Sequence, residues 1–282
     1  DDRLLNVWVG ALQNQKDWPG ILNLYNELQR KESNKFESAA DLIWQAEANE
    51  SLNRPKEAIT FYERAIKKMA AGDERFAAIS NRLAVLYENG DDYQKQMKIY
   101  EDLYAQEKSP KFRQQYALKA GLIGLDKLQN KKLASEWLQR ADLGGVDDTD
   151  LRASMLLIDI DRKDKDLDNA LNRLKDLEKR PVPSSSGFFW QIPFQLGVLH
   201  QNRKEWSASR PYLEQVANQQ QDSDLATDAQ QMLRSVDSVI AKQELQSLLN
   251  DENWKQVSKF ISEQERLGNL PFNKEIFGIW VQ

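Results

Sequence analysis

Apolar residues recur at helical spacing on both sides of short polar segments. Before the segment SLNRP, Leu42 and Ala46 stand one helical turn apart, and after it Ala58, Tyr62 and Ala65 follow at intervals of four and three residues. Such spacing predicts amphipathic α-helices rather than strands, and the polar segment between them is typical of a turn. The local unit is therefore predicted to be helix, turn, helix.

This unit repeats along most of the chain. Each copy is marked by a residue that closes the turn, usually a bulky one, followed three places later by a residue that is usually small. Successive markers lie 36 to 39 residues apart, except for a last interval of 48, and a fixed period of this size predicts a helical repeat array. The seven markers are Trp18, Pro55, Tyr93, Lys131, Leu167, Trp206 and Trp254.

Proline, serine and glycine interrupt the array in PVPSSSGFF, residues 181–189. We predict repeats one to five in residues 1–180, an inter-repeat loop or hinge at 181–189, and repeats six and seven with a linking helix in 190–282. The final segment PFNKEIFGIWVQ reads as the first helix of an eighth repeat. Because it is apolar where a terminal repeat is usually polar, we expect the chain to be an excerpt of a longer array.

Composition narrows the function classes. The net charge is −5, and the 39 basic residues are interspersed with 44 acidic ones, which argues against a nucleic-acid surface. No run of 18 apolar residues predicts a membrane span, and the amino terminus lacks the pattern of a signal peptide. The chain has no cysteine, which excludes disulfides and thiolate chemistry and favours a periplasmic or cell-envelope location over a cytoplasmic one.

Catalytic and metal-binding patterns are absent from the sequence. His200 is the only histidine, and it lies in the ring position of a first helix, where we expect it to pack rather than to catalyse. A calcium loop starting at Asp164 would need a glycine where Asn169 stands and a closing glutamate where Lys175 stands. No phosphate-binding glycine motif occurs. We predict a protein that is not an enzyme and that needs no cofactor or metal.

The repeat resembles the tetratricopeptide repeat (TPR) family, whose units of about 34 residues carry small and aromatic residues at the matching places of both helices. Leu42, Ala46, Ala58, Tyr62 and Ala65 fall on those places. The resemblance implies an all-α fold, a right-handed superhelix of antiparallel helix pairs. It also implies a scaffold that binds a peptide segment or partner protein on its concave face, which the first helices line.

Counting outward from the turns places one residue of the first helix of repeat one, and two of the first helix in each of repeats two to six, on that face. There they either bind a partner or merely cover the inner helices. No pair combines the lysine and asparagine that some TPR proteins use to hold a terminal carboxylate. Alternatives are a docking or regulatory domain of a larger enzyme or polysaccharide-export machine, and a self-associating repeat protein. The predicted binding residues are Asn6, Ile43, Glu47, Asn81, Val85, Lys119, Ile123, Met155, Asp159, Phe194 and Val198.

Overall fold

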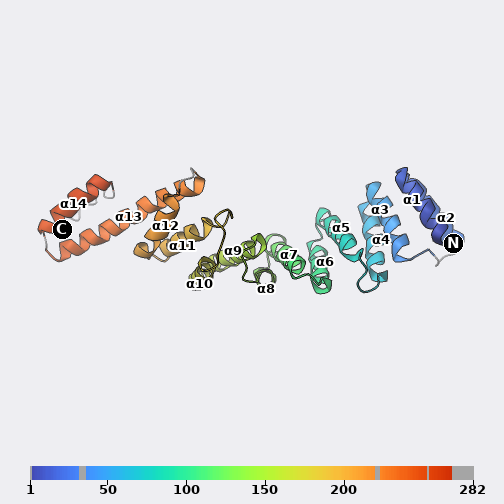
Figure 1. Ribbon diagram of the computed structural model, residues 1–282, viewed down its shortest axis with the longest axis horizontal. Coiled ribbons are helices and arrows are strands. Elements are labelled where there is room, and N and C mark those ends of the chain that lie inside the picture. The colour runs from blue at the N-terminus through green and yellow to red at the C-terminus, as the bar shows by residue number, and fades with distance from the viewer. Residues whose placement is uncertain (1, 32–35, 220–222, 253, 269–282) are drawn as a thin grey trace. The chain divides into compact units, whose positions relative to one another are not determined.

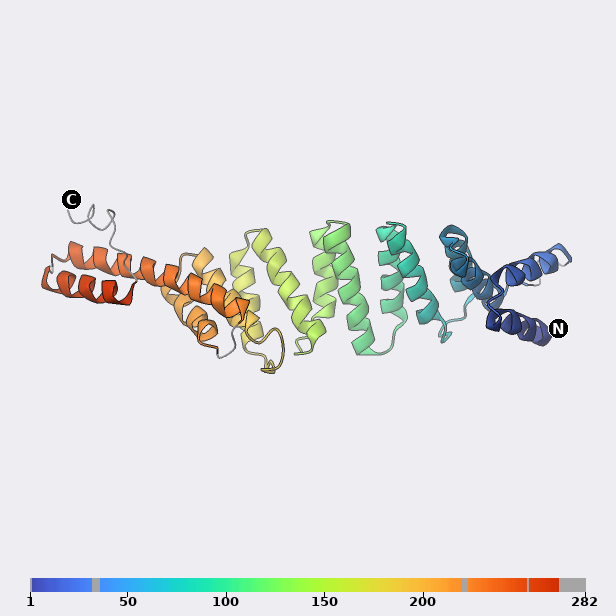
Figure 2. The ribbon, with the colours of Figure 1, turned by 90° about the horizontal axis from the view of Figure 1, so that it is seen from above.

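The computed structural model describes residues 2–31, 36–219, 223–252 and 254–268. These residues form fourteen α-helices and one short π-helical segment, η1, and no strand occurs among them (Figures 1 and 2). The all-α fold class predicted from the sequence is confirmed. The chain divides into two compact units, residues 1–143 and residues 144–282, and each is described by itself.

Both units consist of consecutive helices that pack on their neighbours in sequence. Unit 1 contains α1 (Asp2–Asn14), α2 (Trp18–Lys31), α3 (Ala39–Ser51), α4 (Pro55–Lys68), α5 (Phe76–Asn89), α6 (Tyr93–Gln106), α7 (Pro110–Leu122), η1 (Ile123–Lys127) and α8 (Lys131–Ala141). Unit 2 contains α9 (Asp148–Lys163), α10 (Leu167–Glu178), α11 (Gln191–Asn202), α12 (Trp206–Ala217), α13 (Asp224–Asn250) and α14 (Trp254–Leu267).

The predicted period is confirmed at every copy. The seven marker residues, from Trp18 to Trp254, are the first residues of α2, α4, α6, α8, α10, α12 and α14. These are the second helices of seven antiparallel helix pairs, each joined to its first helix by a tight turn. The structure is therefore the TPR-like array of helix pairs that the sequence predicted.

A left-handed residue builds each of these seven turns. It stands two places before the second helix and in no case is it glycine. Before α4, Asn53 donates its N–H to the carbonyl of Glu50 at 3.0 Å and Arg54 donates to that of Asn49 at 2.9 Å. This pair of bonds satisfies the last carbonyls of the first helix, as in a Schellman motif. The seven residues are Lys16, Asn53, Asp91, Gln129, Lys165, Lys204 and Glu252.

Side chains at the start of the second helices complete the turns. Asp92 and Asp166 accept hydrogen bonds from the backbone N–H groups of Lys95 and Asn169, three residues further on. These bonds satisfy donors that have no partner inside the helix. The chain thus reverses direction within three residues at every pair, which brings the two helices of a repeat into antiparallel contact.

Within a pair, the helices cross most closely at small residues. A Cβ atom at Gly197 of α11 would lie 2.7 Å from Cδ2 of Leu213 on α12, and one at Gly121 of α7 would lie 2.8 Å from Cδ2 of Leu138 on α8. Both leucines are fully buried. Glycine at these places lets a large apolar side chain of the second helix rest on the backbone of the first.

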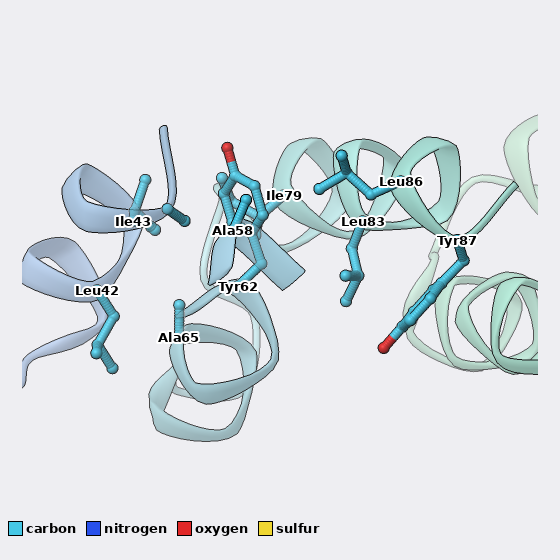
Figure 3. Packing of buried hydrophobic residues seen from close by; sticks show 10 residues of the cluster. Leu42, Ile43, Ala58, Tyr62, Ala65, Ile79, Leu83, Leu86 and Tyr87 are labelled. Atoms are coloured by element: carbon cyan, nitrogen blue, oxygen red, sulfur yellow. The ribbon is translucent and has the colours of Figure 1, made fainter. Parts of the chain in front are cut away.

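Successive pairs meet in a second kind of contact, which we call the seam. In α3, α5 and α11, three positions of the first helix, 14, 10 and 7 residues before the start of its second helix, are buried where the helix packs on the second helix of the preceding pair. Figure 3 shows the seam between α4 and α5, where Ile79 and Leu83 pack in one cluster with Tyr62. The seam residues are Asp41, Gln45 and Ala48 in α3, Ile79, Leu83 and Leu86 in α5, and Ile192, Leu196 and Leu199 in α11.

The seam of α7 is displaced by one residue. The π-helical segment η1 adds one residue before the turn, so the seam positions become Tyr116, Ala120 and Ile123. The displacement also appears in the turn, where Asn130 donates its N–H to the carbonyl of Gly124, six residues back instead of five. In α3, α5, α7 and α11 no seam residue is more than 9 % exposed.

The long interval before the seventh repeat is filled by one continuous helix. α13 has 27 residues; Ala229 in its first half packs with Val216 of α12, and Leu245 in its second half packs with Val257 of α14. The predicted linking helix and the first helix of repeat seven are thus one element. The residues between Glu178 and Gln191 form no helix. The predicted first helix of an eighth repeat lies outside the described residues.

Candidate protein-binding surface

The predicted binding residues of unit 1 all lie on first helices. Val85 of α5 is 52 % exposed, and Asn6 of α1 and Lys119 of α7 are also exposed. Glu47 of α3 and Asn81 of α5 are half-buried, and Asn81 donates from its side-chain nitrogen to the carbonyl of Ala77 one turn earlier at 2.8 Å. These five side chains remain available, in whole or in part, to a partner.

Two predicted residues of unit 1 are inside the protein instead. Ile43 of α3 is 8 % exposed and belongs to the cluster around Tyr62, and Ile123 is 7 % exposed at the seam of η1. For Ile123 the reason is the additional residue of the π-helical segment, which turns the side chain from the open face of the helix into the seam. Neither isoleucine contributes to the accessible surface of unit 1.

The same displacement changes the register of the fourth repeat. The Nζ atom of Lys119 lies over the ring of Tyr100, 5.0 Å from its centroid, just as Arg82 of α5 reaches Tyr62. Lys119 is therefore the counterpart of Arg82 rather than of Asn81. The residues that correspond to Asn81 and Val85 in this repeat are Leu118 and Leu122, both half-buried.

In unit 2 the four predicted residues share no single surface feature. Met155 is half-buried against the cluster of α9, α10 and α11, and Phe194 packs against the cluster that joins α12 and α13. Asp159 is exposed with its carboxylate 3.6 Å from the guanidinium of Arg162, and Val198 is half-buried. Met155 and Phe194 thus pack against the apolar clusters of unit 2, whereas Asp159 remains at the surface.

The clearest polar site on the first helices is a hollow of about 410 Å³ in unit 1. Glu47 is the only predicted residue in its wall. The other lining residues come from the ends of α1 and α3, the start of α2 and the middle of α5. They are Gln13, Trp18, Glu50, Ser51 and Arg82.

A network of charges links the hollow to the second helix α4. The Nη1 atom of Arg82 lies 2.8 Å from Oε1 of Glu47 and 3.8 Å from Oε2 of Glu50. It also donates to the hydroxyl of Tyr62 at 3.2 Å, and that hydroxyl donates to Glu50 at 2.7 Å. Two carboxylates share one guanidinium, so the network carries one net negative charge.

Burial sets the ionisation of this network. Burial raises the pKa of Glu47, against the attraction of Arg82 and together with the repulsion of Glu50. The pKa of Tyr62 is also raised, chiefly by burial, so its hydroxyl stays neutral and keeps its proton for Glu50. The hydrogen bond from Arg82 to Tyr62 raises the pKa of the guanidinium further. Glu47 is thus an incompletely neutralised, partly desolvated carboxylate.

Sequence reasoning found Glu47 but missed its partners. Arg82 lies 35 residues away, and its contact depends on the packing of α5 beside α3. One signal was present: Arg82 and Lys119 are basic residues at equivalent places in consecutive first helices, as the structure shows. A basic residue repeated at the period of the array indicates a polar row across the helices.

His200 is packed, as the sequence predicted. Its ring is 6 % exposed and stacks on Tyr212, with centroids 5.7 Å apart and planes at 7°. Nδ1 lies 2.7 Å from Oε2 of Glu205, and this carboxylate accepts a hydrogen bond from the ring. The hydrogen bond from Arg203 lowers the pKa of Glu205, and the contact with His200 lowers it further. The histidine therefore ties the last turn of α11 to the start of α12.

The acidic run around Asp164 forms the turn between α9 and α10. Asp166 is the N-cap of α10, and Asp161 pairs with Arg173 at 2.8 Å. In the ranges that the structure describes, no group of three or more histidine, cysteine or acidic side chains is placed to hold a metal ion. No helix within those ranges is both long and apolar enough to cross a membrane.

Comparison with known proteins finds likeness in structure alone. No protein-family model and no curated protein sequence matches the chain. The TPR protein YrrB, described as having an unusual peptide-binding site, is 19 % identical over 73 % of this chain and 97 % of its own, with a TM-score of 0.45. PilF of Pseudomonas aeruginosa is 13 % identical over 82 % of this chain and 98 % of its own, with a TM-score of 0.40.

A third similar structure is the C-terminal part of a TPR repeat-containing protein from Cytophaga hutchinsonii. It is 13 % identical over 96 % of this chain and 97 % of its own, with a TM-score of 0.47. At these identities the likeness concerns the helical-repeat fold and not the binding residues.

Proposed function

We propose that this protein is a protein-interaction scaffold whose first helices in unit 1 hold a segment of another protein. The hollow around Glu47 and Glu50 receives a basic side chain of that segment. The observation that carries the proposal is the surplus carboxylate: Arg82 is shared by two acidic groups, and the hollow beside them is open.

A lysine or arginine of the partner would complete the network. Its cation would lie beside Glu47, whose charge is now stabilised only in part because burial removes water from the carboxylate. Charge-assisted hydrogen bonds of this kind are about twice as strong as neutral ones. Val85, 52 % exposed and nearly one helical turn beyond Arg82, offers an apolar contact to the residues that follow in the bound segment.

A row of parallel first helices suits an extended partner. Each repeat presents the next contact at a fixed distance, so a segment lying across α3, α5 and α7 meets several helices in turn.

The absence of cysteine supports an oxidising compartment. We propose that the protein belongs to an assembly in the bacterial cell envelope, which fractionation of the native cells would test.

Selection from a library of random peptides on the purified protein tests the binding site. We expect the selected peptides to carry a lysine or arginine, and the double variant Glu47→Gln and Glu50→Gln to weaken their binding roughly tenfold or more.

Binding should also depend on pH. Because the pKa of Glu47 is raised, this carboxylate takes up a proton at a higher pH than an ordinary glutamate. On acidification, the affinity for the selected peptides should therefore begin to fall at a higher pH than it would if the binding carboxylate were an ordinary surface glutamate.

The matched control removes the same two charges elsewhere. Glu57→Gln with Glu136→Gln changes exposed residues of α4 and α8 outside the hollow and should leave affinity within about twofold. Equal weakening by both double variants would mean that only the overall charge matters. Undiminished binding to the Glu47 and Glu50 variant would place the partner on another surface. Circular dichroism confirms that each variant keeps its helices.

A further inference from the structure

The fourth helix pair concentrates positive charge in a protein that is acidic as a whole. Residues 108–140, which contain α7, η1 and all but the last residue of α8, carry eight basic side chains and two acidic ones, whereas the net charge of the chain is −5. A local excess of one sign attracts a partner of the opposite sign. The eight basic residues, all exposed, are Lys108, Lys111, Arg113, Lys119, Lys127, Lys131, Lys132 and Arg140.

Two of these residues are held over aromatic rings. The guanidinium carbon of Arg113, near the start of α7, lies 4.5 Å from the centroid of the Tyr104 ring. That of Arg140, near the end of α8, lies 4.2 Å from the centroid of the Trp137 ring. The two rings meet edge to face, with their centroids 5.3 Å apart. Attraction between each cation and its ring restrains the guanidinium, whose N–H groups remain able to donate.

The two arginines belong to one surface, because the helix ends that carry them are joined. Gln114, the residue after Arg113, donates from its side-chain nitrogen to the carbonyl of Ala141, the residue after Arg140, at 2.8 Å. This hydrogen bond is buried, whereas both arginines are exposed. We call the surface formed by Arg113 and Arg140 at this end of the helix pair the arginine site.

The second repeat shows which ligand an arginine at this place takes. Arg64 stands nine residues after the first residue of α4, as Arg140 does in α8, and it lies over the ring of Phe61. Its Nη2 atom pairs with Oε1 of Glu37 at 2.6 Å. The array itself thus satisfies a ring-bound arginine with the carboxylate of a glutamate.

In the fourth repeat this carboxylate is missing. Glu37 stands 18 residues before the first residue of α4. The residue 19 before the start of α8, one more because of the residue added by η1, is Phe112, which is 51 % exposed. Within the described ranges, neither Arg113 nor Arg140 forms an ion pair with a carboxylate. Two guanidinium groups and an apolar ring are therefore open to a ligand.

We propose that the arginine site binds an acidic segment of a partner protein. Two carboxylates of that segment each pair with one guanidinium, as Glu37 pairs with Arg64, and a neighbouring apolar residue contacts Phe112. Arginine suits this role because its N–H groups lie in a rigid plane and can bind both oxygens of a carboxylate. The site is separate from the hollow at Glu47, which neither arginine lines.

A nucleic acid fits the arginine site less well than an acidic peptide does. Proteins that bind single strands offer a series of open rings to successive bases. Here Trp137 is 6 % exposed and Tyr104 is half-buried, each beneath an arginine, so Phe112 is the one open ring of the site. The remainder of the chain is acidic and repels a long polyanion that extends past the fourth repeat.

A fluorescein-labelled peptide in which glutamate alternates with serine is the probe, and its anisotropy is followed during titration with the full chain. We expect saturable binding that weakens as salt is added. Arg113→Gln combined with Arg140→Gln should weaken binding at least about tenfold, while circular dichroism stays unchanged because both side chains are exposed. Arg113→Lys with Arg140→Lys keeps the charges but loses the planar donors, so its affinity should lie between the two.

A matched variant separates the site from the overall charge. Arg54→Gln with Arg234→Gln removes two exposed arginines outside the fourth repeat and should leave the affinity for the probe within about twofold. Equal weakening by both double variants would overturn the proposal, because only the net charge would then matter. Undiminished binding to the Arg113 and Arg140 variant would overturn it as well, and so would equally tight binding of a peptide in which glutamine replaces glutamate.

Further outcomes decide between occupants. A single-stranded oligonucleotide that binds more tightly than the peptide, and that the Arg113 and Arg140 variant no longer binds, would make the site one for nucleic acid. A dimer seen by light scattering that this variant abolishes would make the occupant a second copy of the chain. Glu47→Gln with Glu50→Gln should leave the affinity for the acidic probe undiminished, so this proposal and the one for the hollow can fail independently.

Discussion

At the scale of single residues, the turns of the array carry a repeated local strain. Each of the seven turns places a residue with a side chain in the left-handed region, for example Lys165 and Lys204, both at φ 62°. For residues other than glycine this region is disfavoured by roughly 1–2 kcal/mol. The turns are maintained because the helices on both sides require the chain to reverse within three residues, and packing of the pair outweighs the local cost.

Replacing Lys204 with glycine should therefore stabilise the protein. We expect the free energy of unfolding to rise by about 0.5–1 kcal/mol, the relief of left-handed strain less the larger backbone entropy of glycine in the unfolded chain. Urea denaturation of unit 2 measures the change. Lys175→Gly, on the exposed face inside α10, is the matched control and should lower stability by about 1 kcal/mol. If Lys204→Gly lowered the free energy of unfolding as Lys175→Gly does, the inference that Lys204 is strained would be wrong.

At the scale of helices, close crossing rather than helix propensity decides which residues fit. Gly197 lies inside α11, where glycine is unfavourable by roughly 1 kcal/mol relative to alanine. It is tolerated because Leu213 fills the space above it and because the hydroxyl of Ser209 donates to the Gly197 carbonyl at 2.7 Å. Apart from the backbone of its own helix and its two chain neighbours, Gly10 of α1 has nothing within 4 Å of the place a Cβ would take. The two glycines thus occupy opposite environments.

We expect Gly197→Ala to destabilise the protein by about 1–3 kcal/mol, because its methyl group would overlap the buried Leu213 side chain. Gly10→Ala, the same change in open space, should stabilise α1 by about 0.5–1 kcal/mol. Thermal unfolding followed at 222 nm, the far-ultraviolet helix signal, compares the two. Adding Leu213→Ala to Gly197→Ala should cost less than the sum of both changes. Similar changes in melting temperature for Gly197→Ala and Gly10→Ala would show that helix propensity alone determines the effect of both substitutions.

At the scale of the molecule, the packing is local. Within each unit the helices pack on their neighbours along the chain, as Leu42 and Tyr62 do within one pair and Tyr62 and Leu83 across a seam. In such an array stability is approximately the sum of the repeats and of their nearest-neighbour contacts. Residues 1–143 and residues 144–282 each form a compact unit with clusters of their own.

Residues 1–143 should consequently fold without the rest of the chain. The fragment is expected to show a helical circular dichroism spectrum and a cooperative thermal transition, because the clusters around Tyr25 and Tyr62 lie wholly inside it. A fragment of the same length that cuts through pairs, such as residues 55–197, separates α3 from α4 and α11 from α12 and should melt at a lower temperature. A disordered 1–143 fragment would show that its stability depends on unit 2.

The sequence by itself determined the helix pairs, their period and the place of every turn. These features are local: an amphipathic repeat such as Leu42 and Ala46 and a polar turn beside it suffice to predict them. The packed ring of His200 followed from the same repeat, because its place corresponds to that of Tyr87.

Only the tertiary structure decided which side of each first helix is covered. Ile43 and Ile123 are buried and Trp8 is exposed, although all three are apolar residues of first helices. Burial at such a position depends on which helices pack around it and on whether an inserted residue, as in η1, rotates the face. The contact of Glu47 with Arg82 likewise joins two helices 35 residues apart. Such properties arise from neighbours brought together by folding, and no periodicity within a single helix contains them.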